Sequence, residues 1–154
     1  VQPSAQQPAI SYQDILNNPE FKEGIQLAVQ TNDMAMFEQL QNKAVEIAQA
    51  AGLSPQDIAL LKGERGKNFI TFRAKRQLFD TAFRQAFARL EPIDHIKQLY
   101  PEAQDLFAKA DSMIAQRDQR ILAIAEELAE GRELQPFVEQ ARQQWLERAD
   151  SGEN

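Results

Sequence analysis

The side chains that could take part in catalysis or metal binding are few. The chain has no cysteine and a single histidine, His95, which excludes disulfides, thiolate ligands and metal sites built on two histidines. His95 lies beside Asp94, but neighbouring helical residues point to different faces, so this pair is weak evidence for catalysis. Glu126 and Glu130 lie one helical turn apart and could hold a hard cation, although a solvated acidic patch is the favoured interpretation. Without a nucleophile–base pair, the sequence predicts a protein that is not an enzyme and binds no cofactor.

A run of positive charge occupies the middle of an otherwise acidic chain. The net charge is −6, yet the segment from Lys62 to Arg89 holds eight basic and two acidic residues. The favoured interpretation is that this segment faces the acidic helices of its own fold; the alternative is that it binds an external anion such as nucleic acid. The residues that would make such anion or nucleic-acid contacts are Lys62, Arg65, Lys67, Arg73, Lys75, Arg76 and Arg84.

The sequence KGERGK at 62–67 can be compared with three binding motifs. Its glycines are too close together for a Walker loop, and a KH-type RNA-binding loop would need strands that the sequence does not predict. A helix-turn-helix motif fits better, because a small residue, a turn glycine and core residues stand at suitable offsets, namely Ala59, Gly63, Phe69 and Phe72. The favoured interpretation is a glycine-capped turn between two helices.

Phenylalanine is concentrated in the same part of the chain. Five of the nine phenylalanines lie between positions 69 and 87: Phe69, Phe72, Phe79, Phe83 and Phe87. Their spacing places most of them on one helical stripe, which favours a role in the core. The alternative is an apolar groove for a partner helix or an acyl chain.

Two arginines, Arg76 and Arg117, interrupt the apolar stripes of the long helices. A buried guanidinium is costly unless it is paired, so each must find a partner or reach solvent. Asp80 lies one turn after Arg76, whereas Asp118 follows Arg117 directly and is expected on a different face. Pairing within the fold is favoured; the alternative is a polar core slot, formed by Arg76 and Arg117, that holds an anion.

Helix-start signals and apolar periodicity predict an all-α fold. Ser11 with Asp14 is typical of a capping box, and Asn18-Pro19 and Ser54-Pro55 each pair a cap with a proline at the first helical position. Two long helices, at about 68–90 and 101–130, have apolar stripes with nearly strict seven-residue spacing, typical of bundle packing.

We expect these two long helices to pack antiparallel, joined through a short helix and covered by shorter ones. The predicted fold is therefore an irregular multi-helix bundle. Its predicted organisation is a flexible N-terminal tail at 1–10, a single helical domain at 11–149 and a C-terminal tail at 150–154.

The composition of the N-terminal segment indicates the cellular compartment of the protein. Residues 1–9 are rich in Pro, Gln, Ser and Ala, and the sequence begins with valine rather than methionine. Such a segment is typical of a tether or of the start of an exported chain. No apolar run approaches the length of a membrane span. We therefore expect an exported or periplasmic protein without an integral membrane segment.

The function that the sequence favours is a non-enzymatic helical protein-interaction module whose partner is another protein. The alternative is a nucleic-acid-binding protein that uses the basic segment 62–89 with its helix-turn-helix-like start. A weaker alternative is a carrier with an apolar, phenylalanine-lined pocket.

Overall fold

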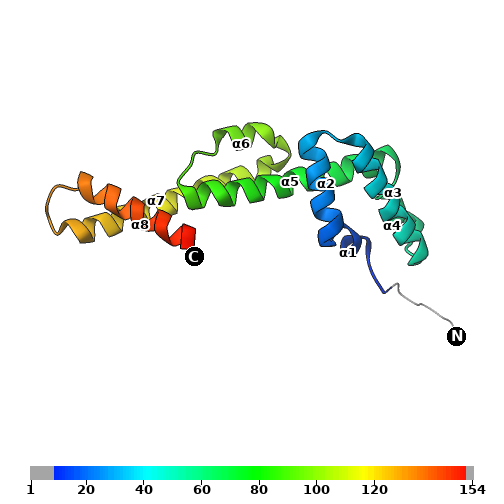
Figure 1. The fold of residues 1–154 in the computed structure, drawn as a ribbon, viewed down its shortest axis with the longest axis horizontal. Helices are drawn as coiled ribbons and strands as arrows, with labels where there is room; N and C mark the ends of the chain where they lie inside the picture. The colour runs from blue at the N-terminus through cyan, green and yellow to red at the C-terminus, as the bar shows by residue number, and fades with distance from the viewer. Residues whose placement is uncertain (1–8, 152–154) are drawn as a thin grey trace. The chain divides into compact units, whose positions relative to one another are not determined.

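The computed structural model describes residues 9–151 of the chain. Over that range it contains eight α-helices, one 3-10 helix and no strand (Figure 1). This confirms the all-α prediction. The predicted tail at 1–10 falls mostly outside the described range, but Ile10 packs against the hydrophobic core. At the other end the last helix continues to Ser151.

The close contacts of the chain gather into two compact units, which are described separately. Unit 1 comprises the residues up to Leu78, and unit 2 begins at Phe79. The boundary falls within the helix α5 (Gly63–Arg89), which contributes residues to both. Whether residues 11–149 fold as a single domain is not tested by this division and stays a prediction.

Unit 1 is built from four helices and the first part of α5. The four are α1 (Tyr12–Asn17), α2 (Pro19–Thr31), α3 (Met34–Ala50) and α4 (Pro55–Ala59). Their starts follow the predicted signals. The Ser11 hydroxyl accepts from the backbone N–H of Asp14 at 3.1 Å, and the Asp14 carboxylate accepts from the N–H of Ser11 at 2.9 Å. Asn18 and Ser54 cap α2 and α4 in the same local way, so donors that the first turn leaves unpaired are satisfied.

The core of unit 1 forms where these helices meet α5. Phe37 of α3 and Leu61, in the turn before α5, are its largest fully buried side chains. Ile15 of α1, Ile25 of α2 and Ile70 of α5 belong to the same cluster. Helices α1, α2 and α3 therefore each bury an apolar face against a shared centre, and α4 contributes the half-buried Ile58.

Unit 2 contains the rest of α5 and the elements that follow it. These are α6 (Asp94–Leu99), the 3-10 helix η1 (Pro101–Leu106), α7 (Phe107–Ala129) and α8 (Gln135–Ser151). Both predicted long helices are present with shifted bounds. The first begins at Gly63 rather than near 68, and the second is preceded by the 3-10 turn instead of starting at Pro101.

The predicted antiparallel packing of the two long helices is wrong. The rings of Phe79 and Phe107 lie 5.3 Å apart, and further along both helices Arg117 Nη1 donates to the Phe87 carbonyl at 2.8 Å. The later residue of α5 therefore contacts the later residue of α7, so the two helices run parallel within unit 2. The two helices are parallel because the chain between them, segment 90–106, runs back beside α5 as α6 and η1 before α7 begins (Figure 1). Helix α8 then folds back along α7, where Ala141 packs with Ile121 and Ala125.

Candidate functional site

Unit 2 contains an open groove with a volume of about 700 Å³. We call it the aromatic groove. Its apolar lining comes from α5, η1, α7 and α8: Phe79, Phe83, Phe87, Ala88, Leu106, Ala110, Met113 and Trp145. Its charged lining consists of one carboxylate, Asp80, and four cations that we call the basic rim: Arg84, Lys109, Arg120 and Arg148.

The aromatic side chains of the groove form a continuous series. Phe79 and Phe83 have nearly parallel rings with centroids 6.3 Å apart, and Phe87 lies 5.7 Å beyond Phe83. Trp145 meets the Phe87 ring edge-on at 5.6 Å. The three phenylalanines are spaced four residues apart, which places them on one face of α5. Phe79 and Phe83 are buried, whereas Phe87 and Trp145 are half-buried and line the accessible part of the groove.

Three of the five predicted groove residues therefore come together. Phe69 and Phe72 belong to unit 1 instead. Phe69 packs against the core of unit 1 and lies 6.3 Å from the Tyr12 ring, whereas Phe72 is 46% exposed. The stripe that the sequence presents as one apolar surface is divided between the two units.

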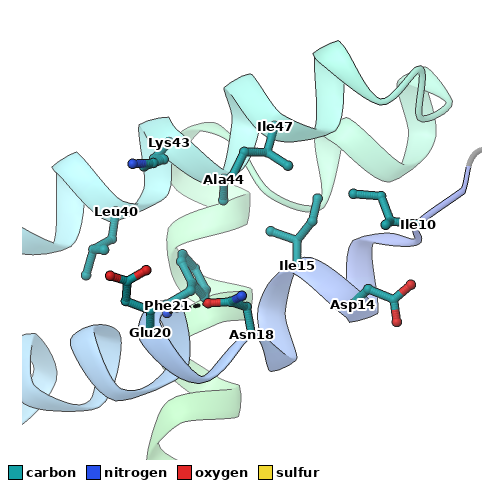
Figure 2. Close-up of a pocket in the computed structure, with 10 residues that line it drawn as sticks. All are labelled: Ile10, Asp14, Ile15, Asn18, Glu20, Phe21, Leu40, Lys43, Ala44 and Ile47. Carbon is teal, nitrogen blue, oxygen red and sulfur yellow. Dashed lines mark hydrogen bonds between the residues drawn. The ribbon is translucent and has the colours of Figure 1, made fainter.

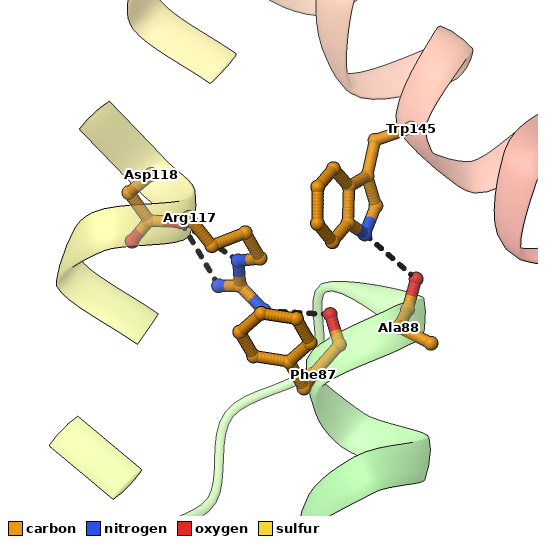
Figure 3. Close-up of polar contacts among 5 residues, drawn as sticks. All are labelled: Phe87, Ala88, Arg117, Asp118 and Trp145. Atoms are coloured by element: carbon orange, nitrogen blue, oxygen red, sulfur yellow. Dashed lines mark hydrogen bonds and ion pairs between the residues drawn. The ribbon is translucent and has the colours of Figure 1, made fainter. Parts of the chain in front are cut away.

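The side of the groove near Trp145 is built on the last turn of α5 (Figure 3). Arg117 of α7 donates from Nη1 to the Phe87 carbonyl, and Trp145 of α8 donates from Nε1 to the Ala88 carbonyl at 3.0 Å. These carbonyls have no partner inside the helix, because they belong to its last turn and the helix ends at Arg89. Two side chains from other helices thus satisfy the end of α5 and hold Trp145 against the groove.

Arg117 is buried and satisfied. Its side chain is 6% exposed, and Nε and Nη2 both donate to one Asp118 oxygen, at 3.0 and 2.9 Å. Asp118 is exposed where Arg117 is buried, as expected of neighbours on different faces, yet the long Arg117 side chain still reaches its carboxylate. Arg76 lies in unit 1, half-buried, with its guanidinium 5.5 Å from the Phe72 ring centre. A polar slot shared by Arg76 and Arg117 stays a prediction.

The basic residues predicted from 62–89 do not share one role. Lys62 and Arg65 are exposed, while Lys67, Lys75 and Arg76 are half-buried, and all five belong to unit 1. Arg73, also in unit 1, donates to Asn17 Oδ1 at 3.0 Å and lies over the Phe69 ring. Arg84 belongs to unit 2 and pairs with Asp80 at 2.8 Å.

The KGERGK glycines have a structural role in the turn between α4 and α5. Gly63 has a φ of +69°, a conformation that favours glycine. A Cβ on Gly66 would clash with the backbone carbonyl group of Leu61. Gln41 of α3 donates to the carbonyls of Leu61 and Gly63 at 2.9 and 3.0 Å, which fixes the turn. These contacts favour the glycine-capped turn over a ligand-binding loop.

The remaining basic-rim residues were missed by sequence reasoning. Lys109 and Arg120 lie on α7 and Arg148 lies on α8, outside the basic segment. Their spacing could have indicated that Lys109 and Arg120 act together. Eleven residues correspond to about three helical turns, so the two side chains share a face of their helix. The spacing alone could not show that this face borders a groove.

Unit 1 has a smaller cavity of about 410 Å³ between α1, α2 and α3 (Figure 2). Its apolar walls include Ile15, Phe21 and Ile47. Two of its four polar lining residues cap helices: Asp14 completes the capping box, and Asn18 accepts from the Phe21 N–H at 3.2 Å. The other two, Glu20 and Lys43, are exposed and of opposite charge, so this cavity lacks the excess of one charge that lines the aromatic groove.

Among residues 9–151, no three His, Cys, Asp or Glu side chains come close enough together to hold a metal ion. His95 is exposed. Within the same range, none of the helices combines the length and apolar character needed to cross a bilayer.

Comparisons with known protein families, with curated protein sequences and with solved structures find no match to this chain.

Proposed function

We propose that this chain is a non-enzymatic helical interaction module whose aromatic groove receives the apolar face of a helix from another protein. The observation that carries the proposal is the continuous aromatic series from Phe79 to Trp145, part of which lines an open surface rather than a closed core. An accessible surface of this kind is a usual mark of a docking site.

The dimensions of the groove favour a helix. Phe87 follows Phe79 by eight positions, which corresponds to about 12 Å of helix, close to two turns. Grooves of this type bind helices that present apolar anchors at positions i, i+3 or i+4, and i+7. The one carboxylate of the lining, Asp80, pairs with Arg84 at 2.8 Å, so the rest of the charged lining is positive.

Trp145 provides a direct test, because it is the single tryptophan of the chain and lies in the groove. The probe is a synthetic amphipathic helix of about five turns with leucines along one face and glutamines on its flanks. We expect a saturable change in tryptophan emission when this peptide is added, because the indole loses contact with water. No change at any concentration would overturn the proposal.

A matched pair of substitutions on α7 locates the binding surface. Met113 lines the groove and is 38% exposed, whereas Leu122 is 43% exposed and lies outside it. Met113→Asp should weaken peptide binding about tenfold or more, because a carboxylate would be placed against the apolar anchors. Leu122→Asp should leave the affinity within about twofold. Equal losses in both variants would contradict docking in the groove.

Nucleic-acid binding is the second candidate, supported by the exposed Phe72 with the Arg76 guanidinium near its ring. An exposed aromatic side chain beside arginine suits base stacking and phosphate contact. Binding of a fluorescent single strand at about 50 mM salt that disappears near 200 mM would favour this function over the first. The carrier alternative rests on the volume of the groove, which lies within the range of small-molecule sites.

A further inference from the structure

The basic rim identifies the chemistry of the partner more closely. Arg84, Lys109, Arg120 and Arg148 are all exposed and come from three different helices. Arg84 pairs with Asp80, while the other three cations form no ion pair with any residue in 9–151. The groove is therefore bordered by more positive than negative charge in a chain whose net charge is −6.

The two acidic residues between Lys109 and Arg120 on α7 pair with cations outside the rim. Asp111 of α7 accepts from Lys97 Nζ through both oxygens, at 2.8 and 2.9 Å. Asp118, the other acid between Lys109 and Arg120, is bound by Arg117. Both carboxylates serve contacts with other cations, so the rim remains available to an outside anion.

The rim charges are spread along the groove rather than gathered at one point. Lys109 and Arg120 are separated by about 16 Å along α7, at 1.5 Å per residue. A single carboxylate, such as that of a fatty acid, would meet only part of this rim. A row of carboxylates spaced along a helix would match it, since charge complementarity at the edge of an interface steers and selects partners.

We infer that the aromatic groove selects an acidic amphipathic helix, with apolar side chains against Phe83, Phe87 and Trp145 and carboxylates against the basic rim. This inference rests on the proposed function and adds to it the charge of the partner. The apolar contacts provide the docking surface, while the rim provides discrimination between helices that have equally apolar faces.

The experiment compares two peptides with the same leucine face, one carrying glutamates on its flanks and the other glutamines. At about 50 mM salt, we expect the glutamate peptide to bind roughly tenfold more tightly, measured by Trp145 emission. Near 500 mM salt the advantage should fall to about twofold, because exposed charges are screened.

Two double variants assign this preference to the rim. Lys109→Gln with Arg120→Gln should remove most of the advantage of the glutamate peptide and leave the affinity for the glutamine peptide within about twofold. Lys62→Gln with Arg65→Gln changes the net charge equally at exposed positions of unit 1 and should preserve the advantage. Circular dichroism of each variant confirms that helix content is retained.

The outcomes separate the two proposals. Equal affinity for both peptides, or loss of the preference in both double variants, overturns the acidic partner while leaving a helix-docking groove intact. Failure of both peptides to bind overturns the proposed function itself. Saturable binding of oleate without binding of either peptide overturns both proposals and favours the carrier.

Discussion

Unit 1 and unit 2 each contain an apolar hollow between helices, but the polar groups around the two hollows are used differently. Around the unit 1 cavity, Asp14 and Asn18 bind backbone donors at helix starts, and the two exposed charges, Glu20 and Lys43, are of opposite sign. Around the aromatic groove of unit 2, the side chains of Lys109, Arg120 and Arg148 are all positive and form no hydrogen bond or ion pair within residues 9–151. Polar groups committed to the backbone stabilise the fold, whereas uncommitted cations around an apolar surface are available for recognition.

Within unit 2, too, some polar side chains bond to the fold itself and others have no partner in it. Arg117 and Trp145 satisfy carbonyls at the end of α5, although both types of side chain could also bind a ligand. Burial separates this arginine from those of the rim, because a buried guanidinium must find its partners within the fold. Residue type alone therefore does not identify a binding residue. What distinguishes one is whether its polar atoms already have partners within the fold.

The largest effect is expected at Phe79, which is 2% exposed and forms the buried end of the aromatic series. Phe79→Ala should lower the free energy of unfolding by about 3–5 kcal/mol, because the core is left with a cavity. Phe72→Ala, at the exposed position in unit 1, should cost under about 1 kcal/mol. Urea denaturation followed by circular dichroism measures both changes. A small loss at Phe79 would mean that the aromatic series is a surface feature throughout.

A somewhat smaller effect is expected in the unit 1 turn. Gly66→Ala should destabilise by about 2–3 kcal/mol, because the new methyl group would meet the Leu61 backbone, which cannot move aside easily. The control is Gly24→Ala in α2, where the new methyl group meets the flexible end of the Leu40 side chain at 2.8 Å. There the higher helix propensity of alanine offsets the crowding, so the net change should stay within about 1 kcal/mol. Tolerance at both glycines would remove the structural explanation of the KGERGK sequence.

The smallest effect concerns the cap at the end of α5. Arg117→Met keeps most of the side-chain volume but removes the donor to the Phe87 carbonyl, and should cost about 1–3 kcal/mol. Arg142→Met is the control, because that arginine forms only an exposed, 3.8 Å contact with Glu139 and its loss should cost under about 0.5 kcal/mol. Thermal unfolding of the two variants distinguishes them. Equal losses of stability in the two variants would mean that Arg117, like the rim cations, does not stabilise the fold.

Much of the secondary structure could be predicted from residues close together in the sequence. Ser11, Asn18 and Ser54 each bond to a backbone N–H three residues later, as expected of their positions. Such bonds depend on the local chain alone, so they can be recognised without knowledge of the fold. The apolar stripes likewise indicated the long helices and the burial of Phe79 and Phe83.

Other features depended on how distant segments meet. The parallel direction of α5 and α7 results from the path of segment 90–106, which no periodicity within either helix specifies. The basic rim joins residues of three helices, so its charges are scattered in sequence and converge only after packing. Arg117 and Trp145 find their carbonyl partners about thirty and fifty-seven residues away. Local hydrogen bonds and side-chain period determine where helices form, while the burial of their faces against one another determines which side chains share a surface.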